Sequence, residues 1–232
     1  MALNWEKPLL LGHRGAPYLA PENTLLSFRL ALEAGLDGVE LDVVLTRDGV
    51  FAVRHDILTP LGPAWTLSFS QLKTLDPDTP TLEEVLGLLE SYPGKLLNVE
   101  LKSFPELSER AAPLLAQMLR GREGVWVSSF DPVALRILKE ESPDLPIAFL
   151  YFGRDLSAFS PCLNLAALHP EKGLVSRDTL SRWHGMGLKV VVWTVNDQRQ
   201  AVDLLRLGVD GLIGDRPDVL VAAREALSWN SS

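Results

Sequence analysis

Residues 9–24 read LLLGHRGAPYLAPENT, and the interpretation of the whole chain begins from this stretch. Its apolar start, together with Pro8, predicts a short buried strand. Glycines flank His13 and Arg14 where that strand should end, and glycine lets the backbone turn sharply there. Asn23 or Thr24 then caps a helix. A basic pair on a loop between a strand and a helix is a suitable place for a phosphate group, although His13 could simply cap the helix.

Extended and helical patterns alternate along the rest of the chain. Strands are predicted near residues 8–11, 39–44, 95–102, 125–130, 146–151, 165–168, 188–195 and 211–213, with a hairpin strand at 50–54. About eight strand–helix units in 232 residues fit an α/β fold of the closed TIM (β/α)8 barrel type. An open doubly wound sheet is the alternative, but no GxGxxG or P-loop motif supports nucleotide binding on it. We expect one domain over residues 1–232, with a short irregular insertion at about 57–80.

Composition narrows the class of protein and its partners. The formal charge of −8 argues against binding to nucleic acid. No apolar run approaches the roughly 20 residues of a membrane span, and the N-terminal residues do not resemble a secretory signal. Cys162 is the only cysteine, so a disulfide framework is excluded, and we expect it to be a buried small side chain. These features predict a cytoplasmic protein with no stable membrane anchor.

Acidic side chains alternate along two of the predicted strands. Residues two apart in a strand share a face, so Glu40 and Asp42 should point the same way. Glu100 and Lys102 should do so on the next parallel strand. Polar side chains at the carboxyl ends of barrel strands face the active site, and three carboxylates there would suit Mg²⁺ or Ca²⁺. The alternative for Glu40 and Asp42 is an ordinary salt-bridged or solvated strand face.

Histidines fall at several predicted strand ends. His13 and His55 both lie on the expected active face, where two histidines can divide general base and general acid work near neutral pH. His169 ends the sixth strand and is predicted to line the pocket. Trp193 ends the seventh strand and is either core or an aromatic wall against substrate. His184 lies within a helix and is predicted to be structural or exposed.

These motifs together resemble those of one known family. The segments are GHRGAP (12–17), PENT (21–24), VELDV (39–43), RHD (54–56), NVELK (98–102), WTVN (193–196) and GLIGDRP (211–217). Their order and spacing, from about Leu9 to Pro217, are similar to those of the glycerophosphodiester phosphodiesterase family. Two departures stand out: Ile57–Pro60 lies where an Arg-Thr segment is frequent, and Gly214 lies where threonine is common.

The resemblance implies a TIM-barrel hydrolase that cleaves glycerophosphodiesters to sn-glycerol 3-phosphate and an alcohol. It implies one divalent cation, Mg²⁺ or Ca²⁺, with Mn²⁺ also admissible. By position it assigns Glu40, Asp42 and Glu100 as metal ligands, His13 and His55 as the acid–base pair, Arg14 and Lys102 as phosphate-binding residues, and Trp193 as the glycerol contact.

Two alternatives remain open at this point. A lysophospholipase D on the same scaffold would need an apolar groove or a membrane-facing patch, for which Trp65, Leu67 and Phe69 in the insertion are the candidates. A barrel that binds phosphodiesters without cleaving them should have lost a histidine or a carboxylate, and none is missing here. Either water or the glycerol 2-hydroxyl could be the nucleophile, and the oligomeric state is left open.

Overall fold

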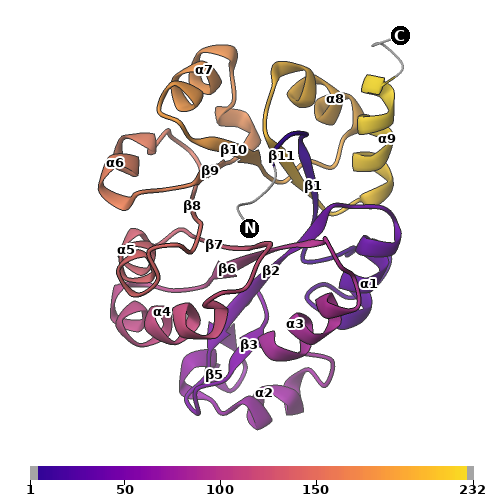
Figure 1. Cartoon of the computed structure of the whole chain (residues 1–232). Coiled ribbons are helices and arrows are strands. Elements are labelled where there is room, and N and C mark those ends of the chain that lie inside the picture. The colour runs from indigo at the N-terminus through magenta and orange to yellow at the C-terminus, as the bar shows by residue number, and fades with distance from the viewer. Residues whose placement is uncertain (1–4, 229–232) are drawn as a thin grey trace.

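A computed structural model describes residues 5–228 (Figure 1). In this part of the chain eight parallel strands form a closed ring. They are β1 (Leu9–His13), β2 (Gly38–Leu45), β6 (Leu96–Leu101), β7 (Val125–Ser129), β8 (Ile147–Tyr151), β9 (Ala167–Pro170), β10 (Lys189–Val192) and β11 (Gly211–Gly214). Strand β1 pairs with both β11 and β2, which closes the ring. The predicted TIM barrel is therefore confirmed, and the open sheet is wrong.

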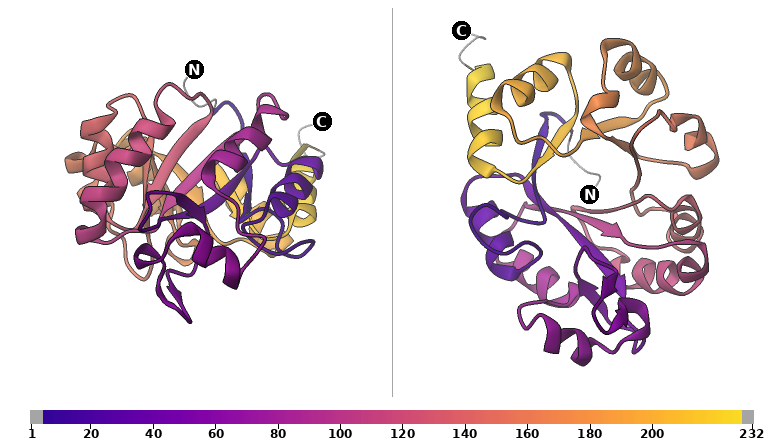
Figure 2. Two further views of the ribbon diagram at one scale, coloured as in Figure 1. Left: turned by 90° about the horizontal axis from the view of Figure 1, so that it is seen from below. Right: turned by 180° about the vertical axis from the view of Figure 1, so that it is seen from behind.

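The helices surround the strands on the outside of the ring (Figures 1 and 2). They are α1 (Leu25–Glu33), α3 (Leu82–Glu90), α4 (Pro105–Leu119), α5 (Pro132–Glu141), α6 (Ser160–Leu163), α7 (Arg177–Gly185), α8 (Gln198–Leu207) and α9 (Pro217–Ser228), with short 3-10 turns η2 (Ser157–Phe159) and η3 (Lys172–Leu174). Local sequence explains where several of them begin. Thr24 caps α1, and Thr81 forms a capping box with Glu84 at the start of α3.

Helix α4 contains Pro113, which the sequence predicts should kink or split the helix. The structure does not split it. Ala112, Leu115 and Ala116 are buried on either side of the proline, so packing against the barrel holds both halves in one helix.

The apolar interior has two main parts. Most of the core lies between the outer faces of the strands and the helices, and it includes Phe28, Leu41 and Val43. A smaller cluster fills the inside of the ring, where Leu11, Trp126, Ala148, Ala167, Val191 and Ile213 are buried together. This cluster packs the interior of the barrel. The polar residues at the carboxyl ends of the strands therefore lie directly above a layer of buried apolar side chains.

The insertion is more regular than predicted. Strand β3 (Phe51–Val53) returns antiparallel along β2 as expected. Residues 57–80, predicted to be an irregular loop, contain β4 (Leu58–Thr59), β5 (Gly62–Pro63), η1 (Ala64–Thr66) and α2 (Phe69–Leu75). Helix α2 begins with a capping box between Ser68 and Gln71. This local signal marks a helix start although residues 57–80 show no regular spacing of apolar residues. The β4–β5 hairpin projects from one end of the barrel (Figure 2, left).

The structure also bears on the cysteine and on membrane-spanning segments. Cys162 is exposed, so its predicted burial is wrong; it lies in α6, a short helix outside the main core. Among residues 5–228, no helix combines the length and the apolar character needed to cross a bilayer.

Candidate active site

A cavity of about 220 Å³ opens where the carboxyl ends of the strands meet. It is lined by His13, Arg14, Glu40, His55, Asn98, Glu100, Lys102, Ser128, Phe130, Leu150, Phe152, Trp193 and Ile213. Seven of the residues predicted from sequence are therefore brought together on this wall. Asp42 lies just behind it and is buried, with Lys102 and Arg14 on its oxygens.

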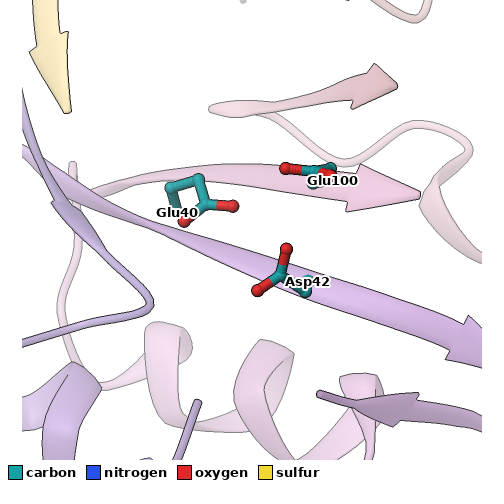
Figure 3. A group of neighbouring side chains, drawn as sticks. All are labelled: Glu40, Asp42 and Glu100. Atoms are coloured by element: carbon teal, nitrogen blue, oxygen red, sulfur yellow. The ribbon is translucent and has the colours of Figure 1, made fainter. Parts of the chain in front are cut away.

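Three carboxylates form the acidic end of this site (Figure 3). Glu40 and Asp42 come from β2, and Glu100 comes from β6, where it is the register partner of Asp42. One oxygen of each lies within 4.8 Å of the others, and all three side chains are buried. The strand alternation that predicted this convergence is confirmed because β2 and β6 are adjacent and parallel.

Two cationic side chains partly balance the carboxylates. Lys102 Nζ lies 2.9 Å from Asp42 Oδ1 and 2.5 Å from Glu100 Oε1. Arg14 Nε lies 3.2 Å from Asp42 Oδ2, and its Nη1 donates to both carboxylate oxygens of Glu22 at 2.9 and 3.1 Å. Burial raises the pKa of Asp42, but Lys102 and Arg14 outweigh this and hold its pKa below the usual range.

Glu40 is the least compensated of the three carboxylates. Its Oε2 accepts the backbone N–H of Arg14 at 3.0 Å, whereas Oε1 is buried and has no hydrogen-bond partner among residues 5–228. Burial and the neighbouring charge of Asp42 raise the pKa of Glu40 to about 8. Among residues 5–228, Glu40 therefore lacks the direct ion pair that Asp42 and Glu100 make.

A divalent cation fits that deficit. The donor set consists only of carboxylate oxygens, which hard cations such as Mg²⁺ and Ca²⁺ prefer. The unpartnered Glu40 Oε1 supplies a free oxygen within the cluster. The residues present are thus suited to a cation, with Glu40, Asp42 and Glu100 as its candidate ligands.

The loop after β1 shapes the other side of the site. Arg14 has φ +54° and Gly15 has φ +92°, so the chain turns through left-handed backbone immediately after His13. A side chain at Gly15 would meet the backbone of α1, with Ser27 C at 2.6 Å, which makes glycine necessary there. Asn23 donates from Nδ2 to Asp42 Oδ2 at 2.9 Å and so ties this loop to the carboxylates.

The two predicted histidines differ in their surroundings. His13 Nδ1 lies 2.6 Å from Asp215 Oδ1, and both side chains are largely buried. Burial lowers the pKa of His13, but the hydrogen bond with Asp215 and the charge of Glu40 outweigh it and raise the pKa. His55 pairs with Asp56 at 2.9 Å, and there the carboxylate is 78% exposed. His13 is consequently the more firmly held of the two.

His169 is not brought into the cavity. Its side chain is fully buried inside the barrel, where the Trp126 indole N–H lies 3.4 Å from Nε2. The predicted strand ended at residue 168, but β9 continues through Pro170. His169 therefore lies within the strand, in the barrel interior below the cavity. Burial lowers the pKa of His169 to about 3, which keeps the imidazole neutral.

An aromatic wall faces the charged residues across the cavity. Phe130 contacts both Trp193 and Phe152 edge to face, with ring centroids 5.6 and 5.9 Å apart. Exposure rises outward along this wall, from the half-buried Trp193 to Phe152, which is 65% exposed. The candidates for an apolar groove in the insertion do not form one, because Trp65 packs on Phe104 and Leu67 is buried.

Several residues were not predicted from the sequence to belong to the site: Asn23, Asn98, Ser128, Phe130, Phe152, Asn196 and Asp215. Asn196 and Asp215 lie within motifs that were recognised, but only the folded chain shows that they contact each other. Phe130 and Phe152 follow β7 and β8 directly. The available signal was their position at the ends of predicted strands, Phe130 as the last residue of 125–130 and Phe152 just after 146–151.

Comparison with known proteins gives a consistent result. The sequence profile of the "Glycerophosphoryl diester phosphodiesterase family" matches residues 13–219. A glycerophosphodiester phosphodiesterase of Caldanaerobacter subterraneus subsp. tengcongensis is 32% identical, over 93% of this chain and 97% of that protein. One from Bacillus altitudinis is 31% identical, over 94% of this chain and 98% of that protein.

Solved structures agree with these relatives. A phosphodiesterase of Oleispira antarctica, in complex with the product sn-glycerol-3-phosphate, is 27% identical with a TM-score of 0.86, over 94% of this chain and 97% of that one. A glycerophosphodiester phosphodiesterase of Thermotoga maritima is 29% identical with a TM-score of 0.78, over 94% of this chain and 98% of that one.

Proposed function

The chain belongs to the glycerophosphodiester phosphodiesterase family, and on this premise we propose that it hydrolyses glycerophosphodiesters to sn-glycerol 3-phosphate and an alcohol, aided by one divalent cation. The observation that carries the proposal is the convergence, in one cavity, of buried carboxylates, two cationic side chains and two histidines. The product bound to the Oleispira antarctica phosphodiesterase supports the glycerol phosphate half of the substrate.

Glu40, Asp42 and Glu100 would hold the cation. When bound, a divalent cation supplies positive charge that stabilises the anionic transition state of phosphodiester cleavage. Arg14 and Lys102 add fixed positive charge beside the same place, and both line the cavity. Because they are anchored on buried carboxylates, they need little reorganisation as charge develops on the phosphate.

His13 and His55 are the proposed acid–base pair. One takes the proton of the attacking hydroxyl, and the other donates a proton to the leaving alcohol. Both line the cavity, and each has a carboxylate on Nδ1, which leaves Nε2 for the proton transfer. The attacking hydroxyl is that of water or of the glycerol 2-position; release of a cyclic phosphate intermediate distinguishes the second route.

A second candidate substrate class has support from the aromatic wall. An acyl chain on the glycerol would leave the cavity along Trp193, Phe130 and Phe152, which present a continuous apolar surface outward. Lysophospholipids carry such a chain, so lysophospholipase D activity is the alternative use of this site. Side-by-side turnover of glycerophosphocholine and lysophosphatidylcholine separates the two substrate classes.

The direct test is the product formed from glycerophosphocholine. We expect glycerol 3-phosphate and choline. Phosphocholine as the phosphorylated product would show cleavage of the opposite bond, and no product from either substrate, with each cation supplied, would contradict the proposed hydrolysis.

A further inference from the structure

We propose that Asp215, held in place by Asn196, is a positioning residue that orients the imidazole of His13 and keeps its Nε2 turned toward the cavity. The inference rests on the proposed role of His13 in proton transfer. It also gives a function to the WTVN and GLIGDRP motifs, whose polar residues Asn196 and Asp215 the mechanism above does not use.

The first observation is the contact between His13 and Asp215. Asp215 directly follows β11, which pairs with β1, so barrel closure brings together two residues 202 positions apart. An ionised carboxylate can only accept a hydrogen bond, so the 2.6 Å contact requires the proton on His13 Nδ1. Neutral His13 then offers the lone pair of Nε2 for proton transfer.

The second observation is that two hydrogen bonds join Asn196 to Asp215. The side-chain amide of Asn196 donates to Asp215 Oδ2, and the backbone N–H of Asp215 donates to Asn196 Oδ1 at 2.8 Å. Both oxygens of Asp215 are therefore occupied, one by His13 and the other by Asn196. This arrangement fixes the carboxylate in one rotamer.

The third observation is that the backbone near Val195, next to Asn196, lies close to the backbone at Gly214, next to Asp215. Val195 N donates to Ile213 O at 2.9 Å, which joins the segment after β10 to strand β11. A Cβ at Gly214 would lie 2.3 Å from Val195 O, so in this chain only glycine permits that approach. The close approach at Gly214 thus coincides with the backbone that places Asn196 beside Asp215.

The surroundings of His13 identify Asp215 as its main partner. Glu40 faces it from β2 and Arg14 follows it on the same loop, but among the described residues only Asp215 hydrogen-bonds to its ring. His55 instead pairs with the exposed Asp56. Orientation by a held carboxylate is therefore a property of His13 alone in this pair.

The test uses Asp215→Asn. Asn196 presents an N–H to one side of position 215, so the carbonyl of the new amide should face Asn196 and its NH₂ should face His13. His13 Nδ1 must then accept, which moves the ring proton to Nε2. Ring ¹⁵N spectra should show this change of tautomer, and kcat for glycerophosphocholine should fall by roughly 10²–10⁴-fold with KM little changed.

A second variant provides a rescue. Adding Asn196→Ala to Asp215→Asn frees the amide to turn its carbonyl toward His13, and we expect partial return of both the Nδ1 tautomer and kcat. The matched control is His184→Gln, which breaks a histidine–aspartate contact of 2.7 Å with Asp210 outside the cavity and should alter neither readout.

The outcomes are distinct. An unchanged His13 tautomer in Asp215→Asn, or unchanged kcat, would overturn the positioning role. Equal loss in the rescue variant would overturn the part assigned to Asn196. Wild-type protein that releases no glycerol 3-phosphate would count against the proposed function, whereas the ¹⁵N readout of the tautomer stands without activity.

Discussion

Replacing His169 with glutamine should make the protein less sensitive to acid. Burial lowers the pKa of His169 to about 3, whereas an unfolded histidine titrates near 6.5. The folded-state pKa is depressed, so the stability that neutral His169 permits is complete above pH 6.5 and is lost as the pH falls toward 3. Each unit of pKa difference corresponds to about 1.36 kcal/mol, so the full loss is about 5 kcal/mol.

The useful window is pH 7 to pH 5, because most carboxylates remain ionised there. Over this interval the unfolded state gains the proton and the folded state does not, so wild type should lose about 2 kcal/mol through His169. Glu40, with its pKa raised to about 8, acts in the opposite direction. Its contribution is common to both proteins, and the difference between wild type and His169→Gln isolates the histidine.

The assay is urea unfolding of both proteins at pH 7 and pH 5. We expect the free energy of unfolding of wild type to fall by about 2 kcal/mol more than that of His169→Gln. Equal changes in the two proteins would refute the buried neutral state. The kcat/KM of His169→Gln for glycerophosphocholine should remain within about threefold of wild type, because the side chain does not line the cavity. A tenfold rise in KM would instead indicate that His169 contacts the substrate, as the sequence predicted.

Further substitutions test other parts of the site and the barrel. His13→Ala and His55→Ala should each lower kcat by at least about 10²-fold with an unchanged thermal midpoint; near-normal turnover would remove that residue from proton transfer. Lys102→Met removes the ion-pair partner of buried Glu100 and one of the two cations on buried Asp42. It should lower the free energy of unfolding by about 3 kcal/mol in EDTA and by less with Mg²⁺ or Ca²⁺; equal loss in both buffers would contradict this. Gly38→Ala places a Cβ 2.2 Å from a carbonyl of β6 and should cost at least about 2 kcal/mol, whereas Gly87→Ala, in open space on α3, should stabilise by about 0.5–1 kcal/mol in the same unfolding assay.

Much of the fold was predictable because local signals agree with the barrel. Strand and helix patterns alternate in order, and Thr81 with Glu84 marked the start of α3 correctly. The convergence of the carboxylates on β2 and β6 followed from alternation along two strands that are neighbours in the sheet.

The remaining features depend on register and on closure of the ring. Sequence alternation shows which face of a strand a residue occupies, but not its depth along the barrel axis. His169 therefore shares the interior face with the cavity residues yet lies beneath them. Asp215 meets His13 only because the last strand pairs with the first, and the aromatic wall forms only because the ring brings the ends of β7, β8 and β10 together.

The most direct test of the central claim is glycerol 3-phosphate release from glycerophosphocholine by EDTA-treated protein, before and after Mg²⁺, Ca²⁺ or Mn²⁺ is restored. Glu40→Gln is assayed in parallel, since it removes the charge of a carboxylate whose buried Oε1 has no hydrogen-bond partner among residues 5–228. We expect activity to vanish with EDTA, to return with a cation in wild type, and to need a higher cation concentration in Glu40→Gln. The same cation titration in both proteins, or full activity in EDTA with no metal bound to the protein, would contradict the carboxylate site.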